Sequence, residues 1–280
     1  MIYSEERFRP KPSYPLYPPY HIGDYLEDSF YKKFIEKNPF LDRNYIAISW
    51  TTLYCENKDK DIQSFLNSLD PTKKYFTVLQ HDDAPRHILP PDTLCFSAGG
   101  NVSGKNIIPI PLICSQLPTE LIIKEEKKYI ASFVGSATHP IRIKMGQTLF
   151  GKDDYQIWIK QWSPSVHKSE FELFLELASK SKYLLCPRGY GLNSFRLYEA
   201  FQLNCVPVII TDKPYLPWQD ELNWNDFSIL IDENNLSNID NILKNINDDQ
   251  YEKLLTTGKK IYSSYFTLDG MYDNIIKRLK

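Results

Sequence analysis

The sequence predicts an α/β protein built from two parallel-sheet units, and three observations carry this prediction. Apolar runs of strand length alternate along the chain with segments whose apolar residues have helical spacing. The chain has 280 residues, which is enough for two ordinary α/β domains. Hydrophobic residues make up 42% and charged residues 24% of it, as is typical of a protein with a large apolar core.

The first unit is predicted to span residues 1–118. Its first twenty residues contain five prolines, which favours an extended arm on the surface. Helices are expected at 23–37 and 61–69, where apolar residues recur with helical spacing. The expected strands are rich in β-branched and aromatic residues. They are residues 44–50, 74–80, 93–98 and 105–113.

Residues 119–128 are the predicted linker, because the polar stretch around them separates two blocks that each repeat the strand–helix alternation. The second unit is predicted to span residues 129–265, and residues 266–280 to form a helix that packs back on the first unit. Strands that alternate with helices in this way form parallel sheets covered on both faces. The expected strands of the second unit are 129–135, 183–186, 205–210 and 227–231, and its clearest helices are 139–151, 169–181 and 247–263.

Composition excludes several classes of partner. The net charge is −2 and the basic residues are scattered, which argues against nucleic acid as the main partner.

Five cysteines with no CxxC pair, mostly in apolar runs, predict buried free thiols and a reducing compartment. The chain has no signal-peptide pattern and no apolar run of membrane-spanning length, so we expect a cytoplasmic protein without a membrane span. An aromatic content of 14% fits either core packing or contacts with carbohydrate.

Residues 183–210 contain the most informative pattern, a strand, a glycine-containing loop, a helix and a second strand. A right-handed crossover places this loop at the carboxyl end of the sheet, where open α/β sheets bind ligands. Gly189 and Gly191 allow a tight turn and a close approach of the backbone to a ligand. The pattern is neither the dinucleotide GxGxxG motif nor a P-loop.

The helix that follows this loop favours an anion, because its first amide groups and its dipole are directed at the same space. Asn193 or Ser194 is the expected N-cap, and either can cap the helix or reach a phosphate oxygen. Arg188 and Arg196 would add positive charge suited to phosphate. Glu199 has two interpretations that spacing leaves open, a ligand for two ribose hydroxyls or an ion pair with Arg196 three positions earlier.

Residues 186–232 resemble the signature of the exostosin-type glycosyltransferases, glycosyltransferase family 47. Weaker but collinear similarity extends the resemblance over residues 45–232, and the chain is similar to compact soluble members found in bacteria and large algal viruses. The matching elements are Cys186–Gly189, Ser194–Ala200, Val206–Val208, Pro217–Trp218 and Trp224–Phe227.

The resemblance implies a GT-B architecture, in which two Rossmann-like domains face a cleft and the second holds a nucleotide sugar, usually of uridine diphosphate. Members of the family are inverting, so an acceptor hydroxyl attacks the anomeric carbon in one in-line step. That step needs a base for the acceptor proton and positive charge for the leaving diphosphate. Family donors include glucuronate, N-acetylglucosamine, galactose, arabinose and xylose.

On this sequence the resemblance assigns the diphosphate to Arg188, Arg142, Ser194 and the helix N-terminus, and the ribose to Glu199. His139 would touch the diphosphate or cap the helix that begins with a proline beside it.

The base is expected in the segment "QHDD" at the end of a predicted strand of the first unit. Asp82 is the first choice and Asp83 and His81 are its rivals, while a solvated acidic turn is the other interpretation of this segment.

We predict that the protein needs no metal and no cofactor. Asp59–Lys60–Asp61 spells a DxD motif, but it lies in a charged run that we interpret as surface, as we do 152–154 and 247–249. The predicted reaction moves a sugar from a UDP-sugar to a hydroxyl of a glycan acceptor, with a neutral sugar favoured and UDP-xylose as the working example. The alternative is an inactive pseudo-glycosyltransferase that binds nucleotide as a scaffold. A phosphate-handling hydrolase would need a carboxylate cluster at the loop, which the sequence lacks.

Overall fold

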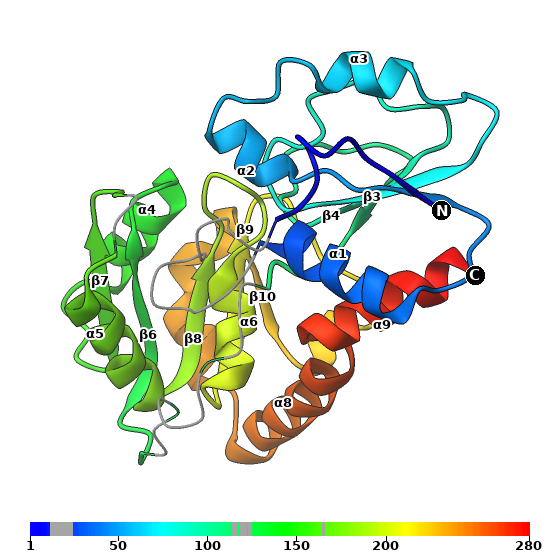
Figure 1. Cartoon of the computed structure of the whole chain (residues 1–280). Helices are drawn as coiled ribbons and strands as arrows, with labels where there is room; N and C mark the ends of the chain where they lie inside the picture. Colours follow the sequence, from blue (N-terminus) through cyan, green and yellow to red (C-terminus); the bar gives the residue numbers. More distant parts are fainter. Residues whose placement is uncertain (12–24, 114–116, 118–121, 123–124, 164–165) are drawn as a thin grey trace. The chain divides into compact units, whose positions relative to one another are not determined.

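The computed structural model describes residues 1–11, 25–113, 117, 122, 125–163 and 166–280. The chain divides into two units (Figure 1). Apart from 19–21, which lie outside the described residues, the first unit combines the chain up to Ser115 with Tyr265–Lys280, and the second is Gln116–Ser264. Within the described ranges each unit contains one five-stranded sheet, and every strand pair in both sheets is parallel. The predicted fold class, two Rossmann-like α/β units, is confirmed.

The sheet of the first unit has its strands in sequence order. They are β1 (Ile2–Tyr3), β2 (Asn44–Ile46), β3 (Tyr75–Leu79), β4 (Leu94–Ser97) and β5 (Ile107–Pro109). The helices of this unit are α1 (Leu26–Lys37), α2 (Trp50–Cys55), α3 (Ile62–Asn67) and α9 (Leu268–Leu279).

The two faces of this sheet are covered by different helices. Phe30 of α1 contacts Tyr45 and Phe76 of the sheet, with ring centroids 5.3 and 6.2 Å away. The ring of Tyr272 on α9 lies 5.2 Å from the same Phe30, so the last helix packs on α1. Trp50 of α2 belongs to a separate apolar cluster that also contains buried residues of α3.

Two local predictions for the first unit are wrong. Residues 2–3 were expected in a surface arm, but they form β1 because the backbone N–H groups of Tyr45 and Ala47 donate to the carbonyls of Met1 and Tyr3. Trp50 was expected at the end of a strand and instead begins α2, where its indole nitrogen donates to the Thr77 hydroxyl at 2.9 Å. Residues 12–20 of the expected arm lie outside the described residues.

The sheet of the second unit has the order β10-β9-β8-β6-β7. Its edge strand β7 was missed by the sequence analysis, although isoleucines 157 and 159 alternate with other residues in it as a strand requires. The strands are β6 (Tyr129–Ser136), β7 (Tyr155–Lys160), β8 (Ser181–Pro187), β9 (Val206–Thr211) and β10 (Ile229–Asp232).

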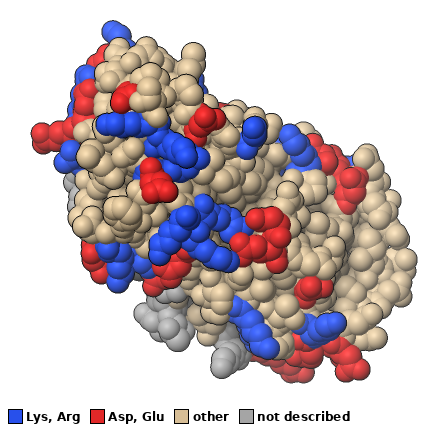
Figure 2. All heavy atoms as spheres, turned by 90° about the vertical axis from the view of Figure 1, so that its right-hand side faces the viewer, with Lys and Arg blue, Asp and Glu red and all other residues tan. Residues whose placement is uncertain are grey.

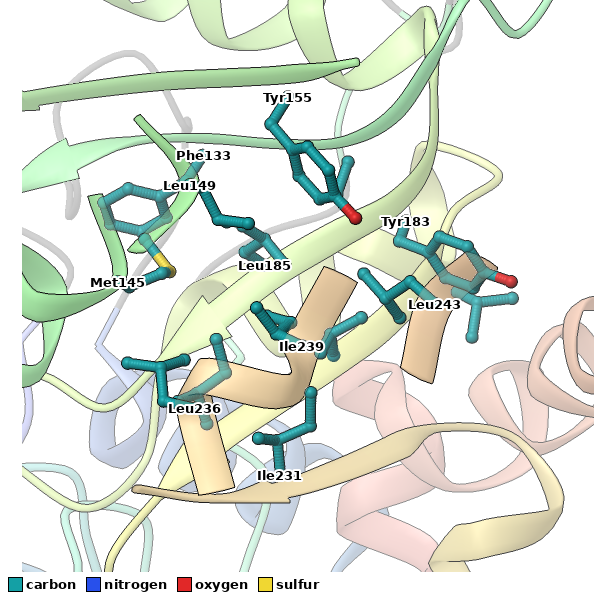
Figure 3. Close-up of a cluster of buried hydrophobic side chains, with 14 of the residues drawn as sticks. Phe133, Met145, Leu149, Tyr155, Tyr183, Leu185, Ile231, Leu236, Ile239 and Leu243 are labelled. Atoms are coloured by element: carbon teal, nitrogen blue, oxygen red, sulfur yellow. The ribbon is translucent and has the colours of Figure 1, made fainter. Parts of the chain in front are cut away.

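Helices cover both faces of the second sheet. On one face, residues of α4 (Pro140–Leu149), α7 (Ile239–Lys244) and α8 (Asp248–Ile261) share a buried cluster with the strands (Figure 3). On the other face, α5 (Lys168–Ser179) and α6 (Phe195–Gln202) contribute to a second cluster. Shorter helical turns connect these elements. They are η2 (Trp224–Asp226), η3 (Glu233–Asn238) and η4 (Tyr262–Phe266).

The surface carries mixed charge, and Figure 2 shows basic and acidic side chains interspersed over one face. None of the helices within the described ranges is long and apolar enough to cross a membrane. Cys95, Cys186 and Cys205 are buried free thiols as predicted, whereas Cys55 is exposed because it ends the short helix α2. Cys114 lies outside the described residues.

Candidate functional site

The glycine-containing loop lies at the carboxyl edge of the second sheet. It begins after Pro187, the last residue of β8, which is paired with Ile210 of β9. The backbone N–H of Arg188 continues this pairing by donating to the Ile210 carbonyl at 3.0 Å. Arg188 and Asp212 therefore directly follow two neighbouring parallel strands, at the edge where α/β sheets bind ligands.

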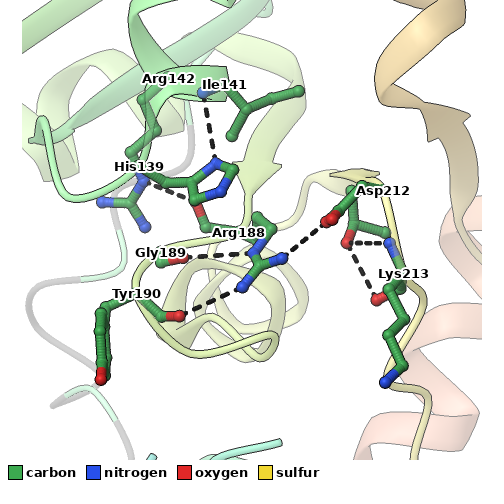
Figure 4. Close-up of polar contacts among 9 residues, drawn as sticks. His139, Ile141, Arg142, Arg188, Gly189, Tyr190, Asp212 and Lys213 are labelled. Atoms are coloured by element: carbon green, nitrogen blue, oxygen red, sulfur yellow. Dashed lines mark hydrogen bonds and ion pairs between the residues drawn. The ribbon is translucent and has the colours of Figure 1, made fainter. Parts of the chain in front are cut away.

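The guanidinium of Arg188 has one acidic partner and two carbonyl partners (Figure 4). Its Nη1 donates to Oδ1 of Asp212 at 2.7 Å. Its Nη2 and Nε donate to the carbonyls of Tyr190 and Gly189, at 3.2 and 3.4 Å. The Arg188 side chain is 13% exposed and that of Asp212 is 48% exposed, so the carboxylate lies on the solvent side of the pair.

Arg142 of α4 supports the loop from behind. Its guanidinium donates to three backbone carbonyls, those of Ser136 at 2.9 Å, Arg188 at 3.0 Å and Pro187 at 3.3 Å. Burial, with a smaller effect of the nearby Arg196, lowers the pKa of Arg142 to about 10. Three of its five N–H donors are thus engaged by the strand end and the loop.

Gly189 allows the close approach of this arginine. A Cβ at position 189 would lie 3.0 Å from Nη2 of Arg142 and 3.2 Å from the hydroxyl oxygen of Thr138. The glycine therefore lets the loop pack against α4 and the segment before it. Gly191, the second glycine of the motif, is buried.

Ser194 is the N-cap of α6, which resolves the choice between the two candidates. Oδ1 of Asn193 instead accepts the backbone N–H of Ser194 at 3.0 Å and the hydroxyl of Tyr198 at 3.1 Å. Both residues are buried, and the Ser194 hydroxyl makes no capping hydrogen bond to α6. The role of Asn193 in this structure is to hold the loop to the helix.

Arg196 and Glu199 form the ion pair that was one of the two interpretations of their spacing. Arg196 also donates from Nε and Nη2 to the Val134 carbonyl, at 3.1 and 2.9 Å, and its guanidinium carbon lies 4.0 Å from the centre of the Phe174 ring. Its charge is thus directed at the end of β6. The carboxylate of Glu199 is buried in the pair, and its contact with a ribose stays a prediction.

His139 is the N-cap of α4, followed by Pro140 in the first turn as predicted. Its Nδ1 accepts the backbone N–H of Ile141 at 3.3 Å (Figure 4). Burial, and to a lesser extent the charge of Arg188, lowers the pKa of His139. In the neutral ring the proton then resides on Nε2, which becomes a hydrogen-bond donor beside Arg188.

The candidate base segment, His81 to Asp83, follows β3 of the first unit. It is packed so tightly on the segment after β4 that a Cβ at Gly99 would lie 2.3 Å from Cα of Asp82 and 2.5 Å from the His81 carbonyl oxygen. The backbone N–H of Asn101 donates to the Asp82 carbonyl at 3.1 Å. The backbone of this acidic turn is therefore fixed by its neighbour in the sheet.

The three candidate bases differ in their contacts. Asp83 accepts from Nδ2 of Asn101 at 2.9 Å and pairs with Arg86 at 3.5 Å. Nδ1 of His81 accepts the Asp83 N–H at 3.1 Å, and burial, followed by the charge of Arg86, lowers the pKa of this histidine. The Asp82 side chain is partly exposed.

Glu27 is a buried acid that the sequence analysis missed. Its Oε1 accepts from the hydroxyl and the N–H of Thr51 at 2.7 and 3.3 Å, and from the N–H of Gln80 at 2.9 Å. Oε2 is buried, and within the described part of the chain it has no hydrogen-bond partner. Burial raises the pKa of this carboxyl. An acidic residue in the first turn of a helix normally indicates a solvated end, so no sequence signal separated Glu27 from surface acids.

Asp59–Lys60–Asp61, the DxD sequence, lies at the surface as expected. Asp61 accepts from Nη1 of Arg7 at 2.7 Å, and Oδ2 of Asp59 lies 3.9 Å from Nε2 of His87. Among the side chains that the structure describes, no group of three or more His, Cys, Asp or Glu residues is placed to hold a metal ion.

The two parallel five-stranded sheets, with a glycine-containing loop at the carboxyl end of β8, define a Rossmann-like α/β protein. The sequence matches the Exostosin GT47 domain over residues 65–246. Because the match covers more than half of the chain, the protein belongs to the exostosin GT47 glycosyltransferase family.

Named relatives match parts of the chain. An Exostosin-1 homolog of Caenorhabditis elegans is 25% identical over 176 residues, which are 55% of this chain and 45% of that protein. A probable glycosyltransferase of Arabidopsis thaliana is 34% identical over 88 residues, 31% of this chain and 19% of the relative. Exostosin-1 of Bos taurus is 30% identical over 115 residues, 38% and 15% of the two chains. The chain thus spans less than half the length of these curated relatives.

Solved glycosyltransferase structures show more distant similarity. TarM matches 91% of this chain and 58% of its own, at 10% identity and a TM-score of 0.46. Sucrose-phosphate synthase from Thermosynechococcus elongatus matches 91% of this chain and 71% of its own, at 10% identity and a TM-score of 0.48.

Proposed function

We propose that this protein is an inverting glycosyltransferase that moves a sugar from a UDP-sugar to a hydroxyl of a glycan acceptor. The observation that carries the proposal is the placement of Arg188, which lies at the carboxyl edge of the second sheet in a loop that Arg142 holds by its carbonyls. Membership of the GT47 family supplies the reaction class.

In the proposed reaction the oxygen of the acceptor hydroxyl bonds to the anomeric carbon while the bond from that carbon to the diphosphate breaks. Arg188 stabilises the negative charge that develops on the diphosphate, and the Nε2–H of His139 and the hydroxyl of Ser194 donate hydrogen bonds to it. Glu199 accepts hydrogen bonds from the ribose, for which its carboxylate must become accessible, since it is buried against Arg196 in the ligand-free protein.

Asp82 is the proposed base that takes the acceptor proton. Its partial exposure and its fixed backbone suit this role, because a base must reach the substrate from a defined position. Asp83, whose carboxylate Asn101 and Arg86 both bind, stays its rival. His81 is less suitable because both of its ring nitrogens have partners: Nδ1 accepts the Asp83 N–H, and Nε2 lies 3.3 Å from Nη2 of Arg86.

The donor is proposed to carry a neutral sugar, with UDP-xylose as the first compound to test, and the reaction is proposed to need no metal. Cationic side chains at the loop then take the place that a metal has in other transferases.

The test is calorimetric titration of the protein with UDP, in EDTA and then with added manganese, for the wild type and Glu199→Gln. Binding that is unchanged by EDTA and weaker in the variant supports the metal-free site and the ribose contact. A screen of UDP-sugars with Asp82→Asn as the inactive control then tests transfer. Nucleotide binding with no turnover of any donor would favour the scaffold alternative, and no binding in either condition would overturn the UDP-sugar assignment.

A further inference from the structure

The Arg188 guanidinium is already occupied by an anion of the protein itself. Asp212 places a carboxylate oxygen 2.7 Å from Nη1, on the more exposed side of the pair. The other two partners of the guanidinium are carbonyls of its own loop, those of Gly189 and Tyr190. Of the carboxylates that the structure describes, Asp212 is the one paired with Arg188 (Figure 4).

Carboxylate and phosphate oxygens compete for the same N–H donors of a guanidinium. A diphosphate that approaches Arg188 from solvent therefore meets a like charge at the position it needs. Two anions held side by side on one guanidinium repel each other, and this repulsion favours the departure of one of them. The carboxylate is attached by a single methylene, so it can leave by rotation of its side chain.

The backbone at Asp212 is held while its side chain is able to turn. The hydroxyl of Thr211, the last residue of β9, donates to the Lys213 carbonyl at 3.0 Å and accepts the Lys213 N–H at 3.1 Å. This turn brackets residue 212 on both sides (Figure 4). Displacement of the carboxylate thus leaves the β9 end and the loop in place.

We propose that Asp212 is an internal competitor for Arg188, which neutralises the guanidinium in the ligand-free protein and is displaced when the donor diphosphate binds. It thereby lowers the affinity for the nucleotide and determines how strongly the site prefers two phosphates over one. The inference rests on the proposed function, since it takes Arg188 to be a ligand of the diphosphate.

The experiment compares UDP, UMP and uridine in calorimetric titrations of the wild type, Asp212→Asn and Glu252→Gln. Glu252 is an exposed acid on α8 of the same unit, so its variant matches the change in net charge. Because exposed ion pairs are weak, we expect Asp212→Asn to bind UDP about two- to fivefold more tightly, with a smaller change for UMP and none for uridine. Glu252→Gln should bind all three as the wild type does.

A double variant tests whether the effect of Asp212 on UDP affinity depends on Arg188. If Asp212 acts through this arginine, then adding Asp212→Asn to Arg188→Met should give no gain in UDP affinity over Arg188→Met alone. Asp212→Ser, which also removes the carboxylate, serves as a second variant if the asparagine disturbs folding, as judged by thermal unfolding.

Weaker or unchanged UDP binding in Asp212→Asn, with normal binding by the wild type, would overturn the competition and leave the proposed function intact. Asp212 would then position Arg188 for the ligand. Absence of UDP binding in both proteins would instead overturn the proposed function together with this inference.

Discussion

Replacing Arg142 by methionine tests whether its guanidinium holds the loop or contacts the nucleotide. Methionine replaces the aliphatic part of the arginine side chain and lacks the guanidinium, whose central carbon lies 5.4 Å from the centre of the Phe133 ring. It loses three donated hydrogen bonds. Two are short, to the carbonyls of Ser136 at 2.9 Å and Arg188 at 3.0 Å, and the third, to Pro187, is 3.3 Å long.

The expected loss of stability follows from these contacts. Hydrogen bonds to charged groups contribute about 1.5–3 kcal/mol each, so the two short bonds would give about 3–6 kcal/mol. Burial opposes part of this, because it lowers the pKa of Arg142 to about 10 and methionine removes the cost of a buried charge. We therefore expect a net loss of about 2–3 kcal/mol in the free energy of unfolding, or a fall in Tm of roughly 4–10 °C.

The assay is thermal unfolding together with calorimetric titration of UDP. The variant should lose UDP affinity as well as stability, because Arg188 is no longer fixed by its own carbonyl. Lys144→Met is the matched control, since it removes the same charge from the same helix. Lys144 is exposed and donates a 3.3 Å hydrogen bond to the Glu233 carbonyl. Its replacement should change the free energy of unfolding by less than about 0.5 kcal/mol. Wild-type Tm with lost UDP binding in Arg142→Met would refute the reasoning and make Arg142 a direct ligand.

Three further substitutions have defined outcomes. Gly99→Ala should cost about 1–3 kcal/mol of stability and lower kcat without changing UDP affinity, since its Cβ would lie 2.3 Å from Cα of Asp82; an unchanged urea midpoint would contradict this. His139→Asn should keep the helix cap and Tm but weaken UDP binding, because asparagine caps well yet lacks the Nε2–H donor; unchanged affinity would leave His139 as a cap only. The raised pKa of Glu27 means that the folded state binds its proton more tightly than the unfolded state, so the stability this adds is present at low pH and is lost as pH rises through the folded pKa. Urea unfolding should therefore show that Glu27→Gln gains stability relative to the wild type as pH rises above the ordinary glutamate pKa of about 4.5, and a difference independent of pH would argue against a raised pKa.

Features that depend on neighbouring residues were predictable from the sequence. The alternation of strands and helices gave the parallel sheets, and Pro140 marked the first turn of α4. The loop after β8 was predicted because two glycines between two apolar runs favour a tight turn between strands. The sequence analysis missed elements that depend on residues far away in the sequence. An example is β1, which forms by pairing with β2.

The side-chain roles at the loop were less predictable, because they depend on which backbone carbonyls the fold brings close to each side chain. Nothing in the sequence indicated that Arg196 would donate to Val134, 62 positions earlier, or that Asn193 would bind Tyr198 and not act as the cap. Glu27 is a similar case, since its partners Thr51 and Gln80 come from two other segments of the first unit.

Three arginines converge on the carboxyl edge of the second sheet, and the structure separates their roles by their acceptors. Arg142 and Arg196 donate to carbonyls at the end of β6, whereas Arg188 faces a carboxylate that is open to solvent. Two carboxylates, Asp212 and Glu199, pair with them, so three positive charges less two negative charges leave a net charge of +1. A diphosphate that displaced Asp212 would leave the net charge of these five side chains unchanged. Arg188 would then have no carboxylate partner and could bind the diphosphate. We therefore expect the charges of Arg142 and Arg196, which are held by backbone carbonyls, to support the loop, and we expect exchange of the Arg188–Asp212 pair to set how tightly an anion binds.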